Sequence, residues 1–235
     1  MAIGGIGQKQ ASQTSQVLVD RFKPRVLISA GFAGALDASL RPGDLVFGER
    51  LVCGMWNVEC GILKSAIRIP KSEFQSTPSL VTQAEETAKA LHLPSWRGML
   101  LSLDAMLTKS EEKKEAAQSR ALAVEMEGAA IAQVALSSGL PFLAVRSISD
   151  TFDQDLGLDF NKLLHGRGRP SYSRIFLALL THPSALSPLW RLKQTTDQAR
   201  RSLAAFLLRF LPQLDPPASI IRSRFLLTSL WLLIQ

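Results

Sequence analysis

Residues 141–150 read PFLAVRSISD, and they give the clearest indication of the class of fold. Its β-branched and aromatic residues are typical of a buried strand, which Gly139 precedes and Asp150 ends. The preceding residues 128–137 are nearly all small or apolar, which predicts a helix buried against a sheet. A buried helix followed directly by a buried strand indicates an α/β protein.

The same alternation of strands and helices extends outward through the first 160 residues. Four more strand-like runs cover residues 25–30, 44–52, 97–103 and 121–124. Helical patterns cover residues 9–22 and 79–91. We therefore predict an α/β fold with a largely parallel or mixed sheet.

The C-terminal part of the chain has a different pattern. After residue 159 we predict no strands, and three segments separated by proline-containing breaks read as helices: residues 171–181, 187–211 and 219–234. We divide the chain into a domain at residues 1–182 and a helical extension at residues 183–235. Residues 161–235 hold eleven Lys and Arg against two acidic residues, which we interpret mainly as a solvated helix face.

The apolar run at residues 225–234 is too short to span a bilayer, which needs about 20 residues. As part of an amphipathic helix it would suit weak contact with a membrane surface. The opposite end of the chain, residues 1–7, reads MAIGGIG, like the end of a strand that enters a Gly-rich turn. A domain seldom begins at the end of a strand, so we expect that this domain lacks its N-terminal strands, through a misplaced start codon, because the chain is a degenerate copy, or because another chain completes the sheet.

Several features exclude other classes of protein. Cys53 and Cys60 are too few for a disulfide framework and do not have zinc-ligand spacing, and the chain has only three histidines. We therefore expect a reducing, cytoplasmic compartment, with neither a metal nor a cofactor. We expect no nucleic-acid partner, because aromatic residues do not alternate with the basic residues of the tail.

Candidate site residues follow three of the predicted strands, where ligands bind in α/β sheets. Residues 29–35 form a Gly-rich turn, Glu125 and Glu127 flank Met126 at a strand-to-helix junction, and Asp150 ends the clearest strand. Capping of the helix N-terminus would explain one glutamate but not two, which favours a ligand for at least one of them. Asp150 could equally be an ordinary turn or N-cap residue.

Together these segments resemble the nucleoside phosphorylase and nucleosidase superfamily. Members of that superfamily have a Gly-rich loop after a strand, a V-E-M-E-x-x-A-x-A segment and a strand that ends in R-x-I-S-D. The corresponding segments here are residues 30–35, 124–132 and 145–150, with further matches at residues 5–7, 40–46 and 102–106. The resemblance covers residues 3–160 and is closest to methylthioadenosine/S-adenosylhomocysteine nucleosidases. It implies a mixed central sheet flanked by helices in three layers, and a homodimer.

The resemblance also implies roles for individual residues. Asp150 would protonate a departing purine near N7, which requires burial or a nearby anion to keep it protonated at neutral pH. Glu127 would bind the ribose 2′- and 3′-hydroxyls and favour the positive charge that develops on the sugar. Met126 would lie against the sugar, and Glu125 would support the site.

The remaining residues implied by the resemblance surround these groups. Met106 and Leu107 would contact the purine, partly through backbone groups, and Gly34 would face the ribose and the nucleophile. Arg146 would orient the neighbouring carboxylates, and Ser149 would complete the substrate-binding set beside Asp150.

The implied activity is cleavage of the N-ribosidic bond of an adenine nucleoside such as methylthioadenosine or S-adenosylhomocysteine, as in methionine salvage. One alternative is a phosphate-dependent phosphorylase, including one that acts on a lipid-linked nucleoside, as in relatives connected with hopanoid synthesis. The bulky Phe32 in the Gly-rich segment makes a phosphate pocket less suitable. Another alternative is a binding module without turnover, because no residue here matches the N-terminal glutamate that activates water in the nucleosidases.

Overall fold

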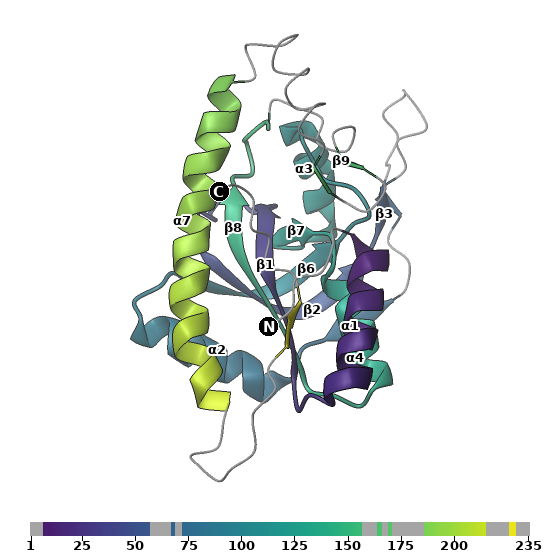
Figure 1. Cartoon of the computed structure of the whole chain (residues 1–235). Helices are drawn as coiled ribbons and strands as arrows, with labels where there is room; N and C mark the ends of the chain where they lie inside the picture. Colours follow the sequence, from purple (N-terminus) through teal and green to yellow (C-terminus); the bar gives the residue numbers. More distant parts are fainter. Residues whose placement is uncertain are drawn as a thin grey trace.

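A computed structural model describes residues 7–56, 67–68, 72–156, 164–165, 169–170, 186–214 and 226–228. A central sheet lies between two layers of helices (Figure 1). Its five main strands are β1 (Leu27–Ala35), β2 (Leu45–Cys53), β6 (Ser95–Ser102), β7 (Ala123–Glu125) and β8 (Phe142–Asp150). Each of these strands overlaps a strand predicted from the sequence.

The pairing of the five main strands closes into a ring. β8 is parallel to β1 and antiparallel to β2, which is parallel to β6. β6 is in turn parallel to β7, and β7 returns to β1 in the antiparallel direction. The predicted mixed sheet is confirmed, and the ring brings the ends of β1, β7 and β8 together.

Helices cover both faces of the sheet, as the three-layer prediction requires. α1 (Gln8–Phe22) and α4 (Gly128–Ser137) lie side by side on one face, and α2 (Pro78–Ala90) and α7 (Leu186–Phe210) lie on the other (Figure 1). The alternation of side chains along β1 serves both layers. Leu27, Ala33 and Ala35 belong to the apolar cluster under α1 and α4, whereas Ile28 and Ala30 belong to the cluster under α2 and α7. The ring of Phe32 is partly buried against the second cluster.

Helix α7 packs directly on the sheet. Its inner face buries Ala199, Leu203, Phe206, Leu207 and Phe210. The ring of Phe206 lies 5.3 Å from that of Phe47 on β2 and 5.0 Å from that of Phe210, measured between centroids. The division of the chain between residues 182 and 183 stays a prediction. Within the described residues, no helix combines the length and the apolar character needed to span a bilayer.

Several short elements were not predicted from the sequence. β5 (Glu73–Gln75) extends the sheet beside β2, and α3 (Ser110–Ala116) follows β6 and is continued by the 3-10 turn Ala117–Ser119. The other short elements are the antiparallel pairs β3 (Met55–Trp56) with β4 (Ile67–Arg68) and β9 (Leu164–His165) with β10 (Arg169–Pro170), and the 3-10 turn Leu211–Leu214.

The prediction that strands stop after residue 159 was wrong. Besides β9 and β10, β11 (Leu226–Thr228) lies parallel to β1, with Leu226 opposite Leu27, where a helix over residues 219–234 was predicted. The physical reason is that β1 pairs with β7 only near its far end, so its first residues leave a second edge free for another strand. The predicted helix at residues 171–181 lies outside the described residues, as does most of the predicted terminal helix.

The Gly-rich segment also differs from its prediction as a turn. β1 continues through Gly31 and Gly34 to Ala35, so residues 31–35 are strand rather than loop. Ladder bonds on both sides account for this extension, since Gly34 pairs with β8 and with β7. At Gly31 and Gly34, near the end of β1, the backbone therefore carries no side chain.

Candidate active site

The end of β1 joins two of the predicted site segments. Gly34 is in register with Asp150 of β8 on one side and with Val124 of β7 on the other. A Cβ atom on Gly34 would lie 2.9 Å from Oδ2 of Asp150 and 3.5 Å from Cγ1 of Val124. Glycine is needed at this position because the carboxylate of Asp150 lies over its backbone. Asp150 and the segment at residues 124–127 are therefore neighbours at one end of the ring.

Glu125, the last residue of β7, is buried and fully hydrogen bonded. Its Oε2 accepts hydrogen bonds from Arg146 Nη2 at 2.5 Å, from the backbone N–H of Gly128 at 2.7 Å and from that of Glu127 at 2.9 Å. The hydroxyl of Ser102 donates to Oε1 and accepts from the next backbone N–H of α4. The predicted capping of this helix by one glutamate is confirmed for Glu125.

Arg146 connects three strands beneath this cap. Its side chain is 1% exposed. Besides Glu125 on β7, its guanidinium donates to the backbone carbonyl and the hydroxyl of Ser29 on β1, both at 2.8 Å. Burial alone would raise the pKa of Glu125, but the Arg146 charge and the hydrogen bonds from Ser102 and Arg146 hold that pKa below its ordinary value. Glu125 is therefore a buried anion that fixes the start of α4.

Glu127 has a different environment. It is half-buried at the N-cap of α4, and its Oε1 accepts a hydrogen bond of 2.9 Å from the backbone N–H of Gly7, at the start of α1. Burial, followed by the negative charge of Glu125, raises the pKa of Glu127 to about 7. The pKa values of the two glutamates thus shift in opposite directions. Glu125 is paired with a cation and accepts several hydrogen bonds, whereas Glu127 accepts one from the backbone of Gly7. Glu127 can change its charge near neutral pH.

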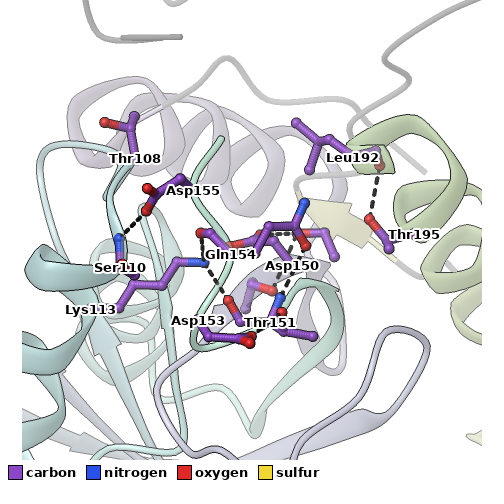
Figure 2. A network of polar contacts seen from close by, with 12 residues as sticks. Thr108, Ser110, Lys113, Asp150, Thr151, Asp153, Gln154, Asp155, Leu192 and Thr195 are labelled. Atoms are coloured by element: carbon purple, nitrogen blue, oxygen red, sulfur yellow. Dashed lines mark hydrogen bonds and ion pairs between the residues drawn. The ribbon is translucent and has the colours of Figure 1, made fainter. Parts of the chain in front are cut away.

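Asp150 is buried at the end of β8 and paired with a cation. Its Oδ2 accepts from Lys113 Nζ at 2.5 Å, and its Oδ1 accepts from the Ser149 hydroxyl at 2.7 Å. Figure 2 shows this contact together with the turn that follows β8. Burial was one of the two conditions expected for Asp150, but the charged group that contacts it is a cation and not the anion suggested as the alternative.

The other predicted site residues lie on the adjoining segments. Met126 is half-buried between the two glutamates, and Met106 is half-buried in the loop after β6. The side chain of Leu107 is buried in an apolar cluster with Leu36 and Val124, which leaves its backbone for the predicted contact with a purine. The contacts of these residues with a nucleoside stay predictions.

Two functional groups of this region were not identified from the sequence. Ser102 opens the matched segment at residues 102–106 but had no assigned role, and Lys113 lies in the run EEKKE, which is typical of a solvated helix face. No pattern in the sequence separates Lys113 from the exposed Lys114 beside it. Among the described residues, no group of three His, Cys, Asp or Glu side chains could hold a metal ion.

One more polar contact lies beside Glu125. The thiol of Cys53, at the end of β2 and in register with Ser102, donates to Oε1 of Gln8 at 3.3 Å. Burial raises the pKa of this thiol, which keeps it protonated at neutral pH. Cys53 is therefore a neutral neighbour of the site and not an activated nucleophile.

Comparisons with known proteins show the family of this chain. A family model described as the phosphorylase superfamily matches residues 1–181. A 5′-methylthioadenosine/S-adenosylhomocysteine nucleosidase of Listeria monocytogenes is 31% identical over 184 residues, which are 75% of this chain and 79% of the relative. A nucleosidase of the same name from Staphylococcus aureus is 30% identical over 68% of this chain and 72% of its own length.

Solved structures share the fold. The nucleosidase of Neisseria meningitidis in complex with methylthio-immucillin-A has a TM-score of 0.65 at 22% identity, covering 89% of this chain and 79% of that one. Futalosine hydrolase of Helicobacter pylori also has a TM-score of 0.65, at 23% identity, covering 88% and 76% of the two chains. At these identities the likeness establishes the arrangement of strands and helices and nothing finer.

Proposed function

The chain belongs to the phosphorylase superfamily, and on that premise we propose that it is a nucleosidase that hydrolyses the N-ribosidic bond of an adenine nucleoside. The observation that carries the proposal is the register of Gly34, which places Asp150 beside the segment at residues 124–127. This pairing brings a candidate proton donor for the base and the strand that leads to a candidate carboxylate for the sugar to opposite sides of β1, at the same end of the sheet.

Each carboxylate has a different task in the proposed reaction. Rupture of the bond leaves positive charge on the ribose and a pair of electrons on the purine. The carboxylic acid form of Asp150 donates its proton to N7, so that the purine departs as a neutral molecule. Glu127 accepts hydrogen bonds from the ribose hydroxyls, and its negative charge stabilises the developing cation.

Fixed neighbours hold these two groups in place. Glu125 and Arg146 keep the start of α4 against β1 and β8, and Glu127 is the N-cap of that helix. Met126 would lie against the sugar and Met106 against the base. A site built on strand ends and on a capped helix varies little in geometry, which favours a reaction that depends on orientation.

The substrate class follows from the relatives. Nucleosidases named for 5′-methylthioadenosine and S-adenosylhomocysteine match more than two thirds of this chain. We therefore propose an adenosine with a thioether at its 5′ position, cleaved in methionine salvage in the cytoplasm by a homodimer. Residues 226–228 belong to the sheet, so the membrane contact suggested for a terminal amphipathic helix has no support at those residues.

The test is release of adenine from methylthioadenosine and from S-adenosylhomocysteine, followed by chromatography. We expect release by the wild type without added phosphate, and a loss in kcat of about 10²- to 10⁴-fold in Asp150→Asn, which cannot donate the proton. Exposed Asp153→Asn, in the following turn, is the control and should keep wild-type activity. Equal activity of Asp150→Asn contradicts the proposal. Release that requires phosphate and gives ribose 1-phosphate identifies a phosphorylase instead.

A further inference from the structure

Lys113 is a buried cation whose donors are all used near Asp150. Its side chain is 0% exposed. The ammonium group donates to Asp150 Oδ2 at 2.5 Å and to the backbone carbonyls of Thr151 at 2.6 Å and Gln154 at 3.1 Å. Lysine is almost never buried to this degree without a partner, because its charged group loses its hydration. The three contacts therefore define a specific site for this side chain.

The same contacts join two segments of the candidate active site (Figure 2). Lys113 lies on α3, which follows the loop of Met106 and Leu107, whereas its partners lie at the end of β8 and in the next turn. Two further bonds tie these segments together. The backbone N–H of Ser110 donates to Asp155 Oδ1 at 2.6 Å, and that of Leu156 donates to the carbonyl of Thr108 at 2.9 Å.

We infer that Lys113 is a positioning residue for the reaction: it orients Asp150 and stabilises the carboxylate that remains after proton donation. This inference rests on the proposed function. The contacts with Lys113 and Ser149 give each oxygen of Asp150 a donor, which is the arrangement that an ionised carboxylate requires. A buried ion pair is weak evidence for a role in stability. Because one partner of this pair is the candidate proton donor, we assign Lys113 a role in the reaction.

The proton balance assigns Lys113 an electrostatic part only. The Asp150 carboxylate first takes up a proton from solvent and then transfers it to N7 as the bond between C1′ and N9 breaks, and the electron pair of that bond stays on the purine. Asp150 is then a carboxylate beside the Lys113 ammonium, which keeps its own three protons throughout. Water adds hydroxide to C1′, and its remaining proton returns Asp150 to the acid form. Lys113 lowers the energy of the step in which the anion is formed.

The test compares Lys113→Met with Lys114→Met, the exposed neighbour on the same helix. We expect kcat to fall at least about tenfold in Lys113→Met, because the proton donor is misplaced and its anion unpaired. KM for methylthioadenosine should change less than about twofold, because the ammonium already donates to Asp150 and to two backbone carbonyls. Lys114→Met should match the wild type in both constants. Thermal unfolding verifies that each variant is folded at the assay temperature.

A double variant separates positioning from a purely structural role. In the Asp150→Asn background, Lys113→Met should cost less than about twofold, since the lysine acts through the missing acid. If Lys113→Met is unfolded, the uncharged variant Lys113→Gln replaces it in both backgrounds. Losses that multiply in the double variant, or full kcat in Lys113→Met, overturn the inference while the proposed function stands. A wild type that releases no adenine overturns both and is detected before any variant is measured.

Discussion

Glu127 changes its charge near neutral pH, because burial and the charge of Glu125 raise its pKa from 4.5 to about 7. A carboxylate with a raised pKa binds its proton more tightly in the folded state. Its contribution to stability is therefore full below about pH 4.5 and is lost as the pH rises through 7. We expect the free energy of unfolding of the wild type to fall over this range relative to that of Glu127→Gln, measured by urea denaturation. A constant difference between the two proteins would contradict the expectation.

At the same scale, the sequence indicated some side chains better than others. Glu125, Glu127 and Asp150 could be selected because acids that follow apolar strands need an explanation. The difference in pKa between the two glutamates depends on Arg146, which contacts Glu125 from another strand. No local sequence pattern indicates that contact. Lys113 could not be selected, because its burial depends on the packing of α3 against the turn after β8.

At the scale of elements, the joint between β1, β7, β8 and α4 depends on Arg146. Replacing it with Met leaves Glu125 as a buried anion without its cation, so we expect a loss of about 3–5 kcal/mol in the free energy of unfolding. Arg97→Met is the matched control, because Arg97 pairs with Glu49 and Glu85 at the surface and should lose no more than about 1 kcal/mol. Chemical denaturation measures both losses. Similar losses in the free energy of unfolding for the two variants would show that the buried network contributes no more to stability than a surface ion pair.

The elements that were predicted correctly are those with a strong apolar pattern, such as β8 and α4. β5 was missed because it is a short edge strand with exposed side chains. α3 was missed because its residues are mostly charged, and nothing in that run indicates that Lys113 is buried. β11 was assigned to a helix because a short apolar run fits either structure. Its partner is the free edge of β1, about two hundred positions earlier, which no local pattern can indicate.

For the whole molecule, the central question is whether α7 and the sheet unfold together. Phe206 is 0% exposed and packs against Phe47 of β2, so we expect Phe206→Ala to cost about 3–5 kcal/mol in a single transition. Leu208, 78% exposed on the same helix, is the control, and its replacement by Ala should change stability by no more than about 0.5 kcal/mol. Denaturation followed by both tryptophan fluorescence and circular dichroism checks this. Two separate transitions would show that the helix is an independent extension.

The architecture could be predicted at this scale because strands and helices alternate regularly, and β1, β2 and β8 each divide their side chains between two apolar clusters. The closure of the five strands into a ring could not. It depends on β8 pairing with both β1 and β2, and sequence patterns give the existence of strands but not their order.

The ion pair of Lys113 and Asp150 also limits how this sequence can diverge. A lineage that first loses the lysine is left with a lone anion at the end of β8, and one that first loses the aspartate is left with a lone ammonium inside the protein. Both intermediates are disfavoured, so selection couples two positions that are 37 residues apart along the chain. In homologues that retain this buried ion pair, the residues at positions 113 and 150 should be inherited or exchanged together.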